Sequence, residues 1–133
     1  ELIVITTPQL MAQKVATRVA DMAKRSFIPL LGVIENMSYF ESNTGEKFNI
    51  FGEGGGEALS DKFGIPLLGK IPIGENTNDI ADGGTPLINQ ENNSVTKVEI
   101  EKLINNIAIK LPPIIDETCT GRLAKVFEEL SNQ

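Results

Sequence analysis

The chain has 133 residues, a net charge of −6 and 41% hydrophobic residues, which fit one modest domain with a single core. Because it has no histidine, a histidine metal site and Ser-His-Asp or Cys-His catalysis are excluded. The acidic balance argues against nucleic-acid binding, and no apolar stretch approaches the ~20 residues that a membrane span needs. One cysteine and the lack of a signal-like start favour a cytoplasmic protein.

The first 34 residues predict one strand–helix–strand unit. Residues 2–6 are short, apolar and β-branched, which is typical of a strand buried on both faces of a parallel sheet. Thr7 and Pro8 predict a helix start with Thr7 as its cap, and residues 30–34 predict the second strand. The helix has one apolar face at helical spacing, made of Met11, Val15, Val19 and Met22, with Ala12, Ala16, Ala20 and Ala23 alongside.

The remaining elements follow from turn residues and periodicity. We expect a hairpin around the turn SNTG, a helix over 57–63 ending at Gly64, a strand over 66–71, a helical turn over 76–81 and a helix capped by Ser94. Together these predict an α/β fold with three layers, in which a mostly parallel sheet with a small β-hairpin is flanked by helices. Residues 1–111 would form the domain, and residues 112–133 a helical tail. Because Glu1 directly precedes a core strand, we expect a fragment of a longer protein.

A run of glycines stands before the helix over 57–63, in the sequence FGEGGGE. A phosphate-binding loop needs a lysine followed by Ser or Thr after its glycines, but Glu57 stands where the lysine belongs. Glu53 and Glu57 would also repel a phosphate. We therefore favour a turn leading into a helix over a phosphate loop.

Polar and ring side chains follow two of the predicted parallel strands. Asn36 comes just after one strand and Pro72 after another, with Asn78 further along. Ligands of open α/β sheets bind at this carboxyl edge, and an Asn amide suits the edge of an adenine base. The alternatives are an Asn that caps its own turn, and an ordinary loop around Pro72 and Asn78.

Five segments in this order carry a family resemblance: TTPQ, GVIENMSYF, FGEGGGE, FGIPLLGKIPI and ADGGTPL. They resemble the carboxyl-terminal half of the Mrp/Nbp35 family, P-loop ATPases of the MinD/ParA type, over about residues 3–87. The resemblance implies an ATP-hydrolysing iron–sulfur cluster carrier that works as a homodimer and delivers clusters to apoprotein clients. It also implies that Asn36, Pro72, Ile73 and Asn78 contact the adenine of ATP, and that the glycines turn the chain near the dimer face.

Two departures from the family pattern shape the expectation. The phosphate loop and the acidic residues that position Mg lie before Glu1 in the family, so this chain alone is not expected to hydrolyse ATP. Many members carry Cys-x-x-Cys after MSYF, where this chain has residues 41–45, ESNTG. Without these thiolates a bridging cluster loses its ligands. Cys119, next to acidic residues, reads as an ordinary loop or helix-start cysteine.

Two other functions stay open at this point. The first is a ParA/MinD-like switch, whose ATP-dependent dimer recruits partners without carrying a cluster. The second is a free-standing module without enzymatic activity, whose partial sheet would need a partner to cover it.

Overall fold

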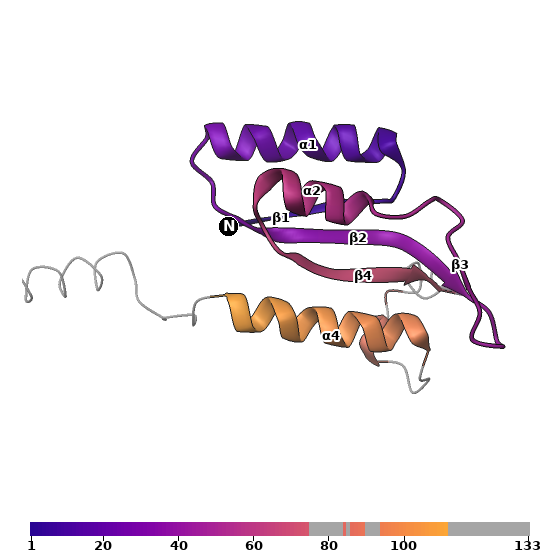
Figure 1. The fold of residues 1–133 in the computed structure, drawn as a ribbon. Helices are drawn as coiled ribbons and strands as arrows, with labels where there is room; N and C mark the ends of the chain where they lie inside the picture. The colour runs from indigo at the N-terminus through magenta and orange to yellow at the C-terminus, as the bar shows by residue number, and fades with distance from the viewer. Residues whose placement is uncertain (75–83, 85, 90–93, 112–133) are drawn as a thin grey trace, which may run out of the picture.

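The computed structural model describes residues 1–74, 84, 86–89 and 94–111. A sheet forms the middle layer, with α1 and α2 on one face and α4 on the other (Figure 1). This confirms the predicted three-layer α/β architecture. The elements are β1 (Leu2–Thr6), α1 (Leu10–Arg25), β2 (Leu30–Glu41), β3 (Lys47–Phe48), α2 (Gly55–Phe63), β4 (Leu67–Ile73), η1 (Leu87–Asn89) and α4 (Val95–Lys110).

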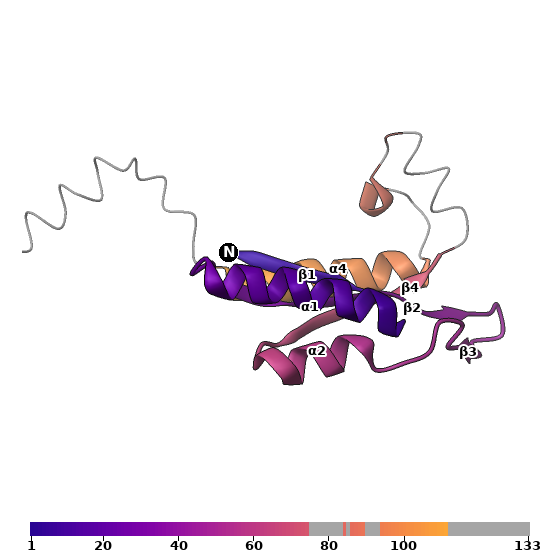
Figure 2. The ribbon, with the colours of Figure 1, turned by 90° about the horizontal axis from the view of Figure 1, so that it is seen from above.

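The sheet has β2 at its centre. β1 and β4 pair with β2 on either side, both in parallel, and the short β3 pairs with the far end of β2 in antiparallel fashion. β2 runs seven residues beyond its predicted end at residue 34, because Phe40 pairs both with Phe48 of β3 and with Ile73 of β4. The predicted hairpin is therefore confirmed, and it projects beyond the helices (Figure 2).

Two apolar clusters hold the layers together. Between the sheet and the α1–α2 layer lie Val4, Ala16, Ala20, Val33, Leu59 and Phe63. Between the sheet and α4 lie Ile34, Leu68 and Leu103. The amide of Asn106 adds a hydrogen bond of 2.9 Å from α4 to the carbonyl of Leu68 on β4. The core is aliphatic except for Phe63, as the low aromatic content predicts.

The start of α1 corrects one expectation. The helix begins at Leu10 with Gln9 at the cap position and without a side-chain capping bond, so Thr7 is not its cap. The chain stays extended at Gln9, with φ −66° and ψ 134°, and α2 packs directly against the preceding loop. A Cβ added at Gly55 would lie 2.8 Å from both the Cα of Pro8 and the carbonyl oxygen of Thr7. This close approach fixes the loop before the helix begins.

The buried side of α1 is narrower than its apolar sequence face. Ala16, Ala20 and Ala23 are buried against the sheet, whereas the larger apolar side chains beside them stay exposed. Small residues face inward because the helix lies close to the strands. The exposed fractions of the larger side chains are 71% for Met11, 59% for Val15, 40% for Val19 and 57% for Met22.

The other two helices follow their sequence signals. α2 begins two residues earlier than predicted, at Gly55, and ends at Gly64 in the left-handed conformation, with φ 64°. α4 is capped as predicted, because the hydroxyl of Ser94 accepts a hydrogen bond from the backbone N–H of Lys97 at 3.3 Å. The predicted helical turn over 76–81 and the tail over 112–133 lie outside the described residues.

Candidate functional site

The predicted site lies at the carboxyl edge of the parallel strands, the end of the sheet that carries the hairpin (Figure 1). Asn36 of β2 pairs in register with Ile71 of β4, and the next residue of β4 is the buried Pro72. Ile73 lies further along, opposite Phe40. The structure thus places Asn36 and Pro72 on neighbouring strands near one level of the sheet. Asn78 falls outside the described residues.

A local hydrogen bond fixes the orientation of the Asn36 side chain. Its Oδ1 accepts a hydrogen bond of 2.9 Å from the backbone N–H of Met37. This local bond is the one that the alternative reading of Asn36 predicts, and it leaves the two N–H groups of the amide as donors. Met37 has a left-handed backbone, with φ 53°, which is rare for a residue other than glycine. Residues held in such conformations cluster at functional sites.

A hollow of about 430 Å³ opens beside Asn36 along the side of β1 that pairs with no described strand. Apolar side chains of β1 and α1 form most of its wall, and Thr6 and Thr7 add polar groups. The hydroxyl of Thr7 is buried and has no hydrogen-bond partner among the described residues. The hollow is lined by Leu2, Ile3, Val4, Ile5, Thr6, Thr7, Ala12, Val15, Ala16, Val19 and Asn36.

The glycine run has two separate structural roles. Gly52 and Gly54 have positive φ angles of 87° and 79°, so they make the turn before α2. Gly55 and Gly56 are buried and permit close packing instead. A Cβ added at Gly56 would lie 2.9 Å from the Cβ of Glu35 and from a methyl group of Leu67. A turn leading into a helix, as the sequence predicts, accounts for all four glycines.

The amino terminus of α2 is occupied by a carboxylate of the protein itself. The backbone N–H of Gly56 donates a hydrogen bond of 2.6 Å to Oε2 of Glu35, whose side chain is completely buried. A helix amino terminus attracts anions through such N–H groups. Because Glu35 takes this place, the glycine run does not form a phosphate cradle. Sequence reasoning missed Glu35, although a lone charge inside the apolar run GVIE was a usable signal.

Lys70 of β4 lies between two carboxylates. Its Nζ is 3.7 Å from Oε1 of Glu35, and it forms a shorter ion pair with Glu57 of α2. Burial alone would lower the pKa of Lys70, but the hydrogen bond to Glu57 and the charges of both carboxylates raise it above its usual value. Burial alone would raise the pKa of Glu57, but the hydrogen bond from Lys70, a backbone hydrogen bond and the charge of Lys70 together lower it below its usual value.

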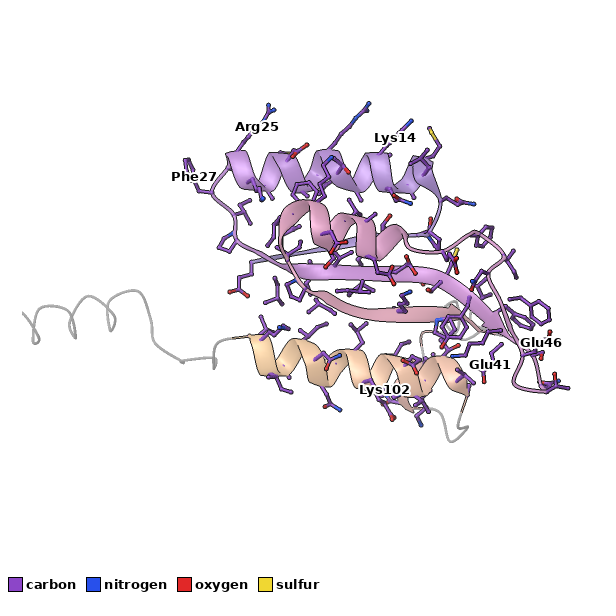
Figure 3. All side chains as sticks on the ribbon, in the orientation of Figure 1. Lys14, Arg25, Phe27, Glu41, Glu46 and Lys102 are labelled. Carbon is purple, nitrogen blue, oxygen red and sulfur yellow. The ribbon has the colours of Figure 1, made fainter. Side chains whose placement is uncertain are left out.

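The hairpin turn occupies the position of the Cys-x-x-Cys expected from the resemblance. Its hydroxyl groups bond to each other, with Oγ of Ser42 2.8 Å from Oγ1 of Thr44. The labelled Glu41 and Glu46 flank the turn at the exposed end of the hairpin (Figure 3). Across the part of the chain that the structure describes, no group of three His, Cys, Asp or Glu side chains could hold a metal ion. Cys119 lies outside this part.

Comparison with known proteins places this geometry in a family. Residues 1–108 match the family model described as NUBPL iron-transfer P-loop NTPase, of the ParA group. A helix able to span a membrane is not found in the described residues.

Curated relatives carry the description iron-sulfur cluster carrier protein. Those of Pyrococcus furiosus and Pyrococcus horikoshii are 41% and 39% identical over 109 residues, which cover 79% of this chain. The match covers only 37% of each of these relatives. The chain therefore spans well under half the length of the proteins it resembles.

Solved structures agree on the fold. A nucleotide-binding protein from Archaeoglobus fulgidus in complex with ADP superposes with a TM-score of 0.53 and 34% identity over 62% of this chain and 34% of that one. The cell division ATPase MinD of Pyrococcus furiosus superposes with a TM-score of 0.60 over 82% of this chain and 43% of that one. At 19% identity, the MinD likeness concerns the fold alone.

Proposed function

The chain belongs to the NUBPL iron-transfer P-loop NTPase family, and from this premise we propose that it supplies the adenine-contacting side of an ATP site in an iron–sulfur cluster carrier. The observation that carries the proposal is the orientation of Asn36 at the carboxyl edge of the sheet, where open α/β folds bind ligands. The resemblance to a nucleotide-binding protein with bound ADP supports it.

Each of the proposed contacts has a chemical reason. With Oδ1 of Asn36 held by Met37, the amide N–H groups are free to donate to a ring nitrogen of adenine. Ile73 is half-buried and offers apolar surface against the flat base, and the ring of Pro72, buried beside it, steers the chain at this point. Asn78 joins this set by family resemblance.

The phosphates and Mg of ATP need groups from outside this chain. The only glycine-rich helix start among the described residues is filled by Glu35, and these residues hold no cluster of metal ligands. We propose that the complete protein supplies the phosphate loop on a segment that pairs with the free side of β1. ATP hydrolysis would then belong to the complete protein, with this chain inactive alone.

We propose the cluster as cargo rather than as a resident cofactor. The names of the curated relatives support the transport of an iron–sulfur cluster. The assembly that we propose for this role is a cytoplasmic homodimer that delivers the cluster to apoprotein clients. The hydroxyl-bearing turn at Ser42 and Thr44 favours a second candidate, a ParA/MinD-like dimerisation switch without a cluster, because hydroxyls are poor ligands for iron compared with thiolates.

Nucleotide selectivity tests the adenine role. In the complete gene product, Asn36→Ala should reduce the preference for ATP over GTP, since an unmet base contact costs about 1–3 kcal/mol. The matched control is Asn106→Ala, which removes an Asn hydrogen bond on α4 and should leave the preference intact. Competitive titration with both nucleotides gives the ratio, and an unchanged ratio in Asn36→Ala refutes the role.

Iron and acid-labile sulfide separate the two candidates. After anaerobic reconstitution of the complete gene product, a carrier should retain both in stoichiometric amounts. Sulfide at background levels, with ATP-dependent dimerisation intact, supports the switch instead. Ser42→Cys combined with Thr44→Cys should increase cluster retention if the hairpin turn lies at the dimer axis.

A further inference from the structure

The strand that carries Asn36 has a break in its pairing just after that residue. Pairing between β2 and β4 keeps one register over residues 34–36 of β2, where Asn36 lies opposite Ile71, and then shifts again before Phe40 and Ile73. Met37, with its left-handed backbone, lies inside this shift. A break of this kind changes the direction of the neighbouring side chains, and the strained backbone conformation persists only when the surrounding structure stabilises it.

Glu35 holds the break from both sides. Its Oε1 accepts a hydrogen bond of 2.5 Å from the hydroxyl of Ser38, which spans Asn36 and Met37. Its Oε2 accepts the bond from the backbone N–H of Gly56 at the start of α2. Glu35 is 0% exposed and Ser38 is 4% exposed, so water does not compete for either bond. The side chain thus ties both ends of the break to a helix.

The negative charge of Glu35 forms an ion pair with Lys70 inside the fold. Lys70, its register partner on β4, places Nζ 3.7 Å from the carboxylate. A buried carboxylate is tolerated when a cation and hydrogen-bond donors surround it, and loses that support when one partner is removed. Glu35 therefore combines ion pairing with two short hydrogen bonds in one buried position.

We propose that Glu35, acting through Ser38, is the positioning residue that sets the base selectivity of Asn36. The proposal rests on the adenine role proposed above. The bond from Ser38 to Glu35 keeps Met37 left-handed, and this conformation points the N–H of Met37 at Oδ1 of Asn36. The Asn36 amide then presents its donors in one fixed direction, as recognition of a single base requires.

Loss of the Ser38 hydroxyl should release this arrangement without touching the nucleotide. Met37 can then relax toward the ordinary extended conformation, and its N–H leaves Oδ1. The Asn36 amide becomes free to turn, and either its oxygen or its nitrogen can face the base. Guanine, whose edge has a different pattern of donors and acceptors, then becomes a better competitor.

The experiment compares Ser38→Ala and Glu35→Gln in the complete gene product with Ser60→Ala. Ser60 makes a bond of the same 2.5 Å length, from its hydroxyl to the carbonyl of Ile65, at the opposite end of α2 from Gly56. It therefore controls for the stability lost when a short hydrogen bond from a serine hydroxyl is removed. The first readout is hydrogen exchange of the Met37 amide without nucleotide, and the second is the ATP-to-GTP affinity ratio.

We expect faster Met37 exchange and a ratio about 2- to 10-fold lower in both Ser38→Ala and Glu35→Gln, with neither change in Ser60→Ala. Unchanged Met37 exchange in Ser38→Ala overturns the proposal. So does an unchanged ratio in Ser38→Ala while Asn36→Ala loses selectivity, and the adenine role then survives. If Asn36→Ala also keeps its selectivity, the adenine role itself fails and the positioning role falls with it.

Discussion

The two edge strands of the sheet differ in how they meet their surroundings. β4 carries Lys70 and Pro72, and its pairing with β2 shifts in register at two places, against one place for β1. Charged residues, proline and breaks in register are the devices that keep a natural edge from pairing with another chain. β1 reads LIVIT without a charge or a proline, and Ile5 is 60% exposed.

The helices sharpen the contrast. α4 packs on β4 through Leu103 and the Asn106 bond. α1 covers β1 only with alanines, and its larger apolar side chains stand exposed beside the hollow along β1. Figure 3 shows the labelled Lys14 and Arg25 pointing away from the sheet, so the charged face of α1 is turned outward. β4 thus has the features of a protected edge, whereas β1 lacks them, which fits the proposal that a further strand pairs with it in the complete protein.

The largest effect should follow from a charge on the receiving edge. In the complete gene product, Ile5→Lys should lower the free energy of unfolding by about 2–3 kcal/mol, because burial of the isoleucine is lost and a cation is desolvated. Ile109→Lys on α4, where Ile109 is 82% exposed, is the control and should change it by less than about 0.5 kcal/mol. Urea unfolding measures both, and equal small losses would mean that β1 stays uncovered.

A smaller effect tests the flank of α1. Val15 is 59% exposed and Val98 of α4 is 38% exposed. If nothing else covered α1, Val98→Ala would therefore lower the free energy of unfolding more than Val15→Ala, because Val98 buries more of its side chain. If a further segment covers α1, the order reverses, and Val15→Ala should cost about 1–2 kcal/mol in the complete gene product. Thermal unfolding of the two variants side by side decides between the orders.

The smallest effect concerns the charges on the protected edge. Glu57→Gln removes the ion pair with Lys70, a partly exposed pair of the kind worth about 0.2–1 kcal/mol. The pKa of Glu57 is lowered on folding, so its contribution is present above about pH 4.5 and disappears as the pH falls through the folded value. The pKa of Lys70 is raised, so its contribution is present below about pH 10.5 and disappears as the pH rises further.

The difference in melting temperature between Glu57→Gln and the unaltered protein should therefore be constant near neutral pH and shrink in acid. The exposed Glu101→Gln on α4 serves as the charge control. A difference that persists at pH 3 would mean that the packing of Glu57, and not its charge, stabilises the edge.

The residues that sequence reasoning missed are those whose role depends on a distant partner. Ser94 bonds within its own helix, so its capping role could be read from the sequence. Glu35 is separated by 21 residues from Gly56, and Lys70 lies on a different strand, so no local pattern reveals that Glu35 contacts both. Thr7 failed as a predicted cap because α2 packs against its loop, which the local sequence does not encode.

The order of the described elements, the parallel sheet with its hairpin, and the acidic, histidine-free composition could be predicted from the residues, because these features follow from the periodicity and composition of neighbouring residues. Three features became visible only in the folded chain: the glycine run contacts a buried carboxylate, Asn36 precedes a left-handed residue, and β1 and β4 differ as edges. These features arise where segments far apart in the chain come into contact. Their energetics depend on burial and on distances of a few ångströms, which the order of residues alone does not fix.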